Sequence, residues 1–254
     1  MKITVCELNN APDIFAEEWK ALVDHAQNEQ SDLVLLPELP FYRWFGVTRD
    51  ENEAEWNAAV IAHDTWLERL TELAPATVLG TRPVTRWDRR FNEGFVWTKD
   101  NGYHPVHLKY YLPDEPGFWE ASWYERGKGD FEPVQTGDVC VGFAICSELW
   151  FFEHSRAYGK AGAELIVTPR CTGMTVDKWL MGGRAAAVSA GAYSISANRN
   201  GAEGDVEFGG QGWIIDPDGN VLGVTSKEQP FLTLDVDLTR AHEAKKTYPR
   251  YIPE

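Results

Sequence analysis

The stretch from Val141 to Glu153 reads Val-Gly-Phe-Ala-Ile-Cys-Ser-Glu-Leu-Trp-Phe-Phe-Glu, and it decides the fold class. Its first five residues form an apolar run of strand length. Residues 155–161 then predict a helix. A cysteine that follows a buried strand and precedes a helix lies where α/β folds carry their chemistry, at the carboxyl ends of strands. The alternative for Cys146 is a small buried hydrophobe, the usual role of a free cysteine.

Strand and helix patterns alternate along the rest of the chain, which predicts an α/β fold. Apolar residues at helical spacing predict helices over 12–27 and 52–74, and the wholly apolar run 33–36 predicts a strand covered on both faces. Asp-Asn-Gly at 100–102 predicts a hairpin turn, so the sheet should be mixed rather than purely parallel. Residues 198–201, Asn-Arg-Asn-Gly, predict a turn after a strand.

Composition and charge limit the possible partners. A chain of 254 residues with 43% hydrophobic residues and no interdomain linker predicts a single domain over 1–254. The formal net charge of −15 disfavours nucleic acids and anionic membranes as partners, because both require a basic footprint. No apolar run reaches transmembrane length, and no signal sequence opens the chain. The four cysteines form no C-x-x-C pair, so we expect reduced thiols and a cytoplasmic location.

Three chemically useful residues each follow an apolar strand. Glu38 stands between two prolines after 33–36, Lys109 ends the strand predicted after the hairpin turn, and Cys146 ends the central stretch. In a wound sheet all three can meet at one edge. A thiol forms a thioester, a glutamate in a dry pocket carries protons, and an ammonium group stabilises an oxyanion. This set predicts acyl transfer through a cysteine nucleophile.

An ordinary, non-catalytic role is also open for each expected partner of Cys146. An isolated glutamate such as Glu38 is more commonly an exposed loop carboxylate, and a lysine that ends a strand, such as Lys109, is more commonly solvated. Only the combination of the three residues favours a site.

The order of these blocks resembles that of the nitrilase superfamily of carbon–nitrogen hydrolases. The matching blocks are Leu-Leu-Pro-Glu38, His-Leu-Lys109 and Ile-Cys146-Ser-Glu-Leu-Trp-Phe-Phe-Glu153. The similarity continues through Gly-Ala-Glu-Leu-Ile-Val-Thr-Pro169 and Asp-Pro-Asp-Gly219, and so extends over nearly the whole chain.

The resemblance implies a four-layer αββα sandwich of two mixed sheets flanked by helices. It also implies Glu38 as general base, Lys109 as oxyanion stabiliser and Cys146 as nucleophile. The loop from Lys109 to Gly127 is similar to that of N-carbamoylputrescine amidases, which makes Glu120 a second active-site glutamate. The alternative for Glu120 is a solvated carboxylate at the rim of the loop.

The substrate-binding residues implied by the resemblance are Ser147, Trp150, Arg170 and Thr172. The residues after the cysteine depart from the usual amidase pattern, because Ser147 and Glu148 replace an aromatic residue and an aspartate. A glutamate two residues after the cysteine is commoner in true nitrilases. Trp150 is alternatively a core residue.

The resulting prediction is a hydrolase that cleaves a small linear amide or an N-carbamoyl compound through a thioester. No metal or organic cofactor is implied, and family members commonly form homodimers or larger assemblies. Two alternatives stay open. One is a nitrilase that hydrolyses a nitrile to the acid, and the other is a non-catalytic binding scaffold on the same fold.

Overall fold

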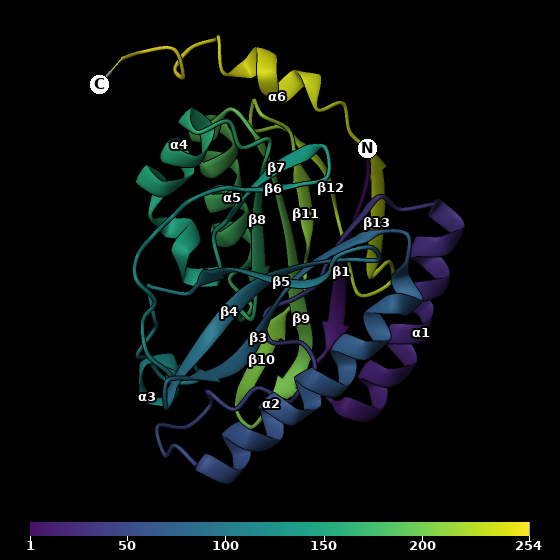
Figure 1. Cartoon of the computed structure of the whole chain (residues 1–254), viewed down its shortest axis with the longest axis vertical. Helices are drawn as coiled ribbons and strands as arrows, with labels where there is room; N and C mark the ends of the chain where they lie inside the picture. The colour runs from purple at the N-terminus through teal and green to yellow at the C-terminus, as the bar shows by residue number, and fades with distance from the viewer. Residues whose placement is uncertain (254) are drawn as a thin grey trace.

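The computed structural model describes residues 1–253, and a continuous series of hydrogen-bonded strands organises them (Figure 1). Strand β1 (Lys2–Asn9) lies in the middle of the order β5-β4-β3-β2-β1-β9-β8-β7-β6. Residues 2–6 of β1 pair with β2 and β13, whereas residues 7–9 pair with β9. Strand β1 therefore belongs to both halves of the strand system.

The first half contains parallel and antiparallel pairs. Strands β1, β2 and β3 run parallel, and β3, β4 and β5 form an antiparallel meander. The bounds in this half are β2 (Leu33–Leu35), β3 (Thr77–Arg86), β4 (Arg89–Thr98), β5 (Gly102–Leu108) and β13 (Phe231–Asp235).

The second half is also mixed, as predicted. Strands β7, β8 and β9 run parallel, as do β9 and β1, whereas β6 pairs antiparallel with β7, and β10 and β11 pair antiparallel with β9. The bounds here are β6 (Val134–Thr136), β7 (Val139–Phe143), β8 (Leu165–Arg170), β9 (Tyr193–Glu203), β10 (Val206–Gly209), β11 (Trp213–Ile215) and β12 (Val221–Val224). The turn predicted at 198–201 is wrong, since β9 continues through these residues.

Helices cover the strands from two sides (Figure 1). Helix α1 contacts β1 and α2 contacts β3, while α5 contacts β8, β9 and α4. The bounds are α1 (Pro12–Glu29), α2 (Glu53–Glu68), α3 (Glu120–Trp123), α4 (Phe152–Lys160), α5 (Val176–Ala190) and α6 (Thr239–Ala244), with short 3-10 helices η1 (Arg69–Leu73) and η2 (Cys146–Trp150).

Local sequence explains the two long helices of the first half. Helix α1 has Pro12 in its first turn and buries Phe15, Trp19, Leu22 and Ala26 along one stripe. Helix α2 begins after Asn52, whose side-chain oxygen accepts a hydrogen bond of 3.1 Å from the backbone N–H of Glu55.

The main core lies between the two halves of the strand system. It joins apolar residues of β2, β3 and β4 to those of β7, β8 and β9. Gly94 of β4 shows how close the halves come, because a Cβ atom at this position would lie 3.0 Å from Cδ1 of Phe143 in β7. Strands β4 and β7, from different halves, therefore contact one another in this core.

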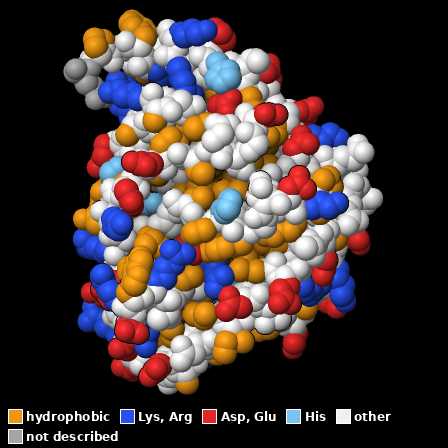
Figure 2. Space-filling view, viewed as in Figure 1, with side chains coloured by type: hydrophobic (Ala, Val, Ile, Leu, Met, Phe, Trp, Pro, Cys, Tyr) orange, Lys and Arg blue, Asp and Glu red, His pale blue; other side chains and the backbone are white. Residues whose placement is uncertain are grey.

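The molecular surface has no single sign of charge on the face seen in Figure 2. Acidic and basic side chains are interspersed there, with apolar side chains between them. Among the described residues, no helix is both long and apolar enough to cross a membrane.

Candidate active site

The site begins at Glu38, which is fully buried. Its backbone N–H donates to the carbonyl of Arg170 in β8 (3.1 Å), and its carbonyl accepts from Nε of Arg199 in β9 (3.0 Å). The chain segment that follows β2 is thus fixed by two strands of the other half. One carboxylate oxygen, Oε1, accepts a hydrogen bond of 2.7 Å from Nδ2 of Asn92 in β4. The other oxygen, Oε2, is buried and has no hydrogen-bond partner among the described residues.

Lys109 follows β5 and connects two carboxylates. Its Nζ atom lies 2.7 Å from Oε1 of Glu38 and 2.6 Å from Oε2 of Glu120, and all three side chains are buried. Burial alone would lower the pKa of Lys109, but the charges of Glu120 and Glu38 outweigh it and raise this pKa. The lysine is therefore an ammonium group at neutral pH.

Glu120 opens the short helix α3 inside the loop that the sequence marked out. Besides Lys109, its carboxylate accepts a short hydrogen bond from the hydroxyl of Tyr124. Burial raises the pKa of Glu120 to about 7, against the attraction of Lys109, and the nearby Glu38 adds to the rise. Glu120 is a buried member of the cluster rather than a rim carboxylate.

Cys146 is the first residue of η2, directly beyond β7, and it has a left-handed backbone with φ of 49°. A non-glycine residue with this conformation is uncommon, and such backbone outliers concentrate at functional sites. Its Sγ atom lies 3.9 Å from the carbonyl oxygen of Cys171. Burial, followed by the charge of Glu38, raises the pKa of the Cys146 thiol well above its usual value, although Lys109 opposes the rise. The resting residue is therefore a thiol.

The structure brings all four predicted catalytic residues together. A carboxylate oxygen of Glu38, one of Glu120 and Sγ of Cys146 all lie within 4.8 Å of one another. Lys109 bridges the two carboxylates. A general base, an ammonium group and a thiol at these distances can carry out acyl transfer.

The family model described as carbon–nitrogen hydrolase matches residues 2–246. The chain belongs to the carbon–nitrogen hydrolase family. The predicted resemblance to the nitrilase superfamily is thereby confirmed, and the protein is an enzyme of that superfamily.

Relatives of this carbon–nitrogen hydrolase are named for different substrates. The 2-oxoglutaramate amidase of Paenarthrobacter nicotinovorans is 29% identical over 243 residues, which cover 87% of this chain and 77% of the relative. The N-carbamoylputrescine amidase of Solanum tuberosum is 26% identical over 243 residues, with 86% and 79% covered. The citrullinase of Francisella tularensis is 24% identical over 220 residues, with 78% and 76% covered.

Solved structures show the same fold. A carbon–nitrogen hydrolase from Helicobacter pylori G27 superposes with a TM-score of 0.89 at 23% identity, covering 99% of this chain and 94% of the other. An amidase from Nesterenkonia sp. AN1, which carries the acetamide moiety of fluoroacetamide on its active-site cysteine, gives a TM-score of 0.78 at 19% identity, covering 96% and 92%. At these identities the likeness concerns the fold alone.

The four predicted substrate-binding residues of the carbon–nitrogen hydrolase have different surroundings. Arg170 is buried and donates to Ser196 Oγ (2.7 Å), to Thr172 Oγ1 (3.0 Å) and to the carbonyl of Gln211. Trp150 packs on Trp179 of α5 with ring centroids 5.0 Å apart. The Ser147 hydroxyl donates to the carbonyl of Tyr111. Substrate contact stays a prediction for all four.

Two polar residues near the site were not predicted from the sequence. Asn92 holds Glu38 from β4, and Glu148 contacts the backbone on either side of the site. A signal for Asn92 does exist, because it is a polar residue on a strand between the apolar Phe91 and Phe95. In the sequence, Glu148 stands out only because it replaces the aspartate of the amidase pattern.

Glu38, Glu120 and Cys146 are also the described residues whose side-chain atoms are spaced closely enough to hold a metal ion. In this arrangement the ammonium group of Lys109 contacts both carboxylates. It therefore supplies the positive charge that a bound cation would otherwise provide.

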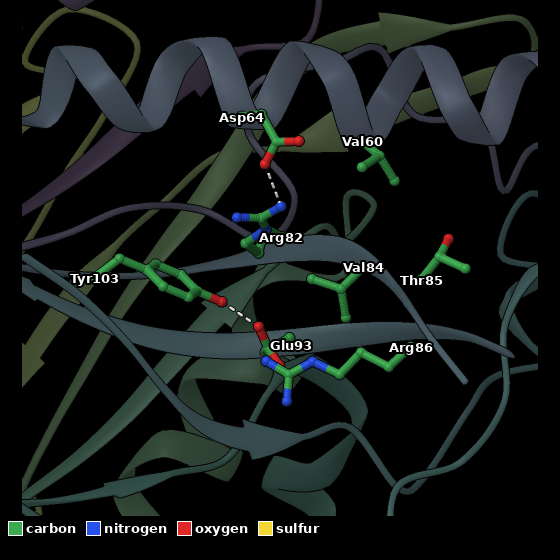
Figure 3. A pocket seen from close by; sticks show the side chains of 8 residues that line it. All are labelled: Val60, Asp64, Arg82, Val84, Thr85, Arg86, Glu93 and Tyr103. Atoms are coloured by element: carbon green, nitrogen blue, oxygen red, sulfur yellow. Dashed lines mark hydrogen bonds and ion pairs between the residues drawn. The ribbon is translucent and has the colours of Figure 1, made fainter. Parts of the chain in front are cut away.

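A separate pocket of about 310 Å³ lies between α2 and the strands β3, β4 and β5 (Figure 3). Its arginines are paired with carboxylates, Arg82 with Asp64 and Arg86 with Glu93. Glu93 also accepts a hydrogen bond from the hydroxyl of Tyr103 (Figure 3). None of the four clustered residues lines this pocket, so it is distinct from the candidate active site.

Proposed function

We propose that this enzyme hydrolyses the carbon–nitrogen bond of a small amide or N-carbamoyl compound through a thioester on Cys146. The observation that carries the proposal is the buried cluster in which Lys109 bridges Glu38 and Glu120 beside the Cys146 thiol. The names of the relatives, which include N-carbamoylputrescine amidase and 2-oxoglutaramate amidase, support this substrate class.

The first half-reaction uses Glu38 as the base. Because the pKa of Cys146 is raised, its proton has to be removed as the sulfur attacks the substrate carbonyl. Oxygen Oε2 of Glu38 has no hydrogen-bond partner within residues 1–253 and can accept that proton. The ammonium group of Lys109 and the backbone N–H of Ser147 stabilise the oxyanion. Glu38 then returns the proton to the departing ammonia or amine, and the thioester forms.

The second half-reaction releases the acid. Water takes the place of the departed amine, Glu38 removes its proton, and hydroxide attacks the thioester carbonyl. Glu120 keeps the Lys109 ammonium group in place through the contact of 2.6 Å and lies near the water. Collapse of the second tetrahedral intermediate returns the thiol and the carboxylic acid.

We also propose a detailed arrangement of the layers of the fold. A four-layer αββα sandwich in one domain is supported by the close approach of Gly94 to Phe143 and by the contacts of α1 and α2 with one half and α5 with the other. Assembly as a homodimer and a cytoplasmic location stay predictions.

The test is intact-protein mass spectrometry after incubation with a mixed panel of small amides, N-carbamoyl compounds and nitriles, with ammonia assayed in parallel. The variants are Cys146→Ala and Glu38→Gln, and the control is Cys140→Ala, which removes a partly exposed thiol elsewhere. We expect an acyl adduct on the wild type and on Cys140→Ala that is absent from Cys146→Ala.

The outcomes separate the alternatives. Ammonia and acid released from amides support the proposal, whereas turnover of nitriles alone identifies a nitrilase. Ammonia release that continues undiminished in Cys146→Ala contradicts the mechanism. Tight binding of a compound without any turnover points to the binding scaffold.

A further inference from the structure

The carboxylate of Glu148 is buried two residues after the nucleophile and accepts hydrogen bonds from two different parts of the fold. Oxygen Oε1 accepts from the backbone N–H of Tyr110 (2.7 Å), and oxygen Oε2 accepts from the backbone N–H of Ile145 (2.8 Å). Glu148 is 1% exposed, so these bonds are formed out of contact with water. Buried charge-assisted hydrogen bonds of this kind are among the strong ones in proteins.

The two backbone donors are the immediate neighbours of catalytic candidates. Tyr110 follows Lys109 beyond β5, and Ile145 precedes Cys146 beyond β7. Strand β5 belongs to the first half of the strand system and β7 to the second. One carboxylate therefore joins the chain beside the ammonium group to the chain beside the thiol, across the interface between the halves.

His107 completes this arrangement from β5. Its Nε2 atom lies 2.9 Å from Oε2 and 3.1 Å from Oε1 of Glu148, so it contacts both oxygens. Burial would lower the pKa of His107, but the charge of Glu148, followed by Asp130, outweighs it and raises this pKa. The neighbouring ring of Phe131, 5.0 Å away between centroids, covers the imidazole.

We propose that Glu148 is a positioning residue that fixes the Lys109 ammonium group relative to the Cys146 thiol, with His107 as its counter-ion. The inference rests on the proposed function, because it assigns Glu148 a part in the reaction of that same cluster. Glu148 does not touch the reacting atoms in this geometry; it acts through the backbone of its neighbours.

The geometry specifies which substitution is informative. Glutamine has one acceptor oxygen, so in Glu148→Gln one of the two backbone N–H groups must face an NH₂ group. Glu148→Asp keeps two acceptor oxygens on a shorter side chain. His107→Gln leaves both backbone bonds in place. The matched control is His104→Gln, which changes an exposed histidine on the same strand.

The experiment combines steady-state kinetics on an amide from the panel with a readout that needs no turnover. That readout is the rate at which iodoacetamide alkylates Cys146, followed by peptide mass spectrometry, with Cys146→Ala giving the background. Thermal unfolding of each variant is recorded alongside, so that loss of fold is separated from loss of positioning.

For Glu148→Gln we expect kcat to fall by about 10²-fold, the cost of a misplacement of roughly 1 Å at a reacting group, while KM changes by less than about threefold. Alkylation should slow by about tenfold, as one unit of higher thiol pKa would produce when Lys109 moves away. Glu148→Asp and His107→Gln should lose less activity than Glu148→Gln, and His104→Gln should match the wild type.

Several results would overturn the proposal. One is a folded Glu148→Gln variant with kcat and alkylation rate within about twofold of wild type, and another is a lower unfolding temperature with unchanged kinetics in the folded protein. If Glu148→Gln does not fold, wild-type kcat and alkylation rate in Glu148→Asp are decisive against it, because the shorter side chain cannot keep both backbone bonds at their present lengths. If the wild type turns over no amide and alkylation still slows in the variants, the positioning role stands and the proposed function fails.

Discussion

Glu38, Lys109 and Glu120 place two carboxylates and one ammonium group in a space closed to water. Ionising both carboxylates leaves one buried negative charge without a counter-charge, which is costly at low dielectric. Burial raises the pKa of Glu120 to about 7, so this carboxyl group changes charge near neutral pH. The cluster can thus exist in two protonation states in the physiological range.

This titration predicts a stability that depends on pH. Between its ordinary pKa of 4.5 and about 7, Glu120 holds its proton in the folded state and loses it in the unfolded state. The folded state binds more protons in this window, so the free energy of unfolding falls as pH rises, by up to about 3 kcal/mol. Glu120→Gln should remove this slope, as measured by urea unfolding at pH 5, 6 and 7.

The control for this measurement is Glu125→Gln, an exposed carboxylate on the same loop. It should retain the wild-type slope between pH 5 and 7. Parallel stability curves for the wild type and Glu120→Gln would show that Glu120 does not titrate in this window.

The site residues that could be predicted from the sequence are those marked by a pattern in the neighbouring residues. Glu38, Lys109 and Cys146 each follow an apolar strand, and Glu120 lies in a loop with a family pattern; the structure brings them together, while their catalytic roles stay predictions. The roles of Asn92 and Glu148 were missed because Glu38, the partner of Asn92, and Tyr110 and His107, two partners of Glu148, are distant in sequence. Asn92, for example, bonds to Glu38 across a separation that no local pattern encodes.

At the level of elements, β9 is longer than its sequence indicates. Asn198 and Arg199 are typical turn residues in sequence, yet both are buried and their side chains donate hydrogen bonds within the protein. Arg199 donates to the carbonyl groups of Glu38, Leu39 and Tyr42, and also to Oδ1 of Asn10. The strand continues because its polar side chains supply the hydrogen bonds that solvent would otherwise give to the segment that carries Glu38.

Replacing Arg199 should therefore weaken both stability and activity. Arg199→Met leaves two buried carbonyl groups and one partly buried one without this donor, and we expect the free energy of unfolding to fall by roughly 3–5 kcal/mol. The loss of support for the backbone of Glu38 should lower kcat in the fraction that remains folded. Urea unfolding and kinetics below the unfolding transition measure the two effects.

An exposed arginine provides the comparison for this substitution. Arg89 lies on β4 and pairs with Glu125 at the surface, so Arg89→Met should leave stability nearly unchanged. Equal stability losses in Arg199→Met and Arg89→Met would contradict the role given to the buried contacts.

On the scale of the whole molecule, the two halves meet through apolar faces with little free space. Gly94 shows how little space is left. A Cβ atom at this position would lie 3.0 Å from Cδ1 of Phe143 and 3.5 Å from Cδ1 of Ile145. Ile145 is also one of the residues that Glu148 holds. Packing between the halves and alignment of the site therefore depend on the same few contacts.

A double-mutant cycle tests this packing. Gly94→Val should lower the free energy of unfolding by about 2 kcal/mol, because extra methyl groups are forced against Phe143. In a Phe143→Leu background the same substitution should cost at least about 0.5 kcal/mol less, since the clash is relieved. Urea unfolding of the four proteins gives the coupling, and strictly additive losses would show that these positions do not face one another.

The shared position of β1 has a consequence for how the protein is made. Ile3 pairs with Leu234 on one edge of β1, and Leu8 pairs with Arg199 where the strand crosses into the second half. A ribosome produces Ile3 long before Leu234, so this partner does not exist when β1 is made. Until β13 follows, β1 is therefore a strand with an open edge, the kind of surface on which other chains pair and aggregate. Because Arg199 also holds the segment carrying Glu38, the contacts of the reactive centre are complete only after β9 has been made.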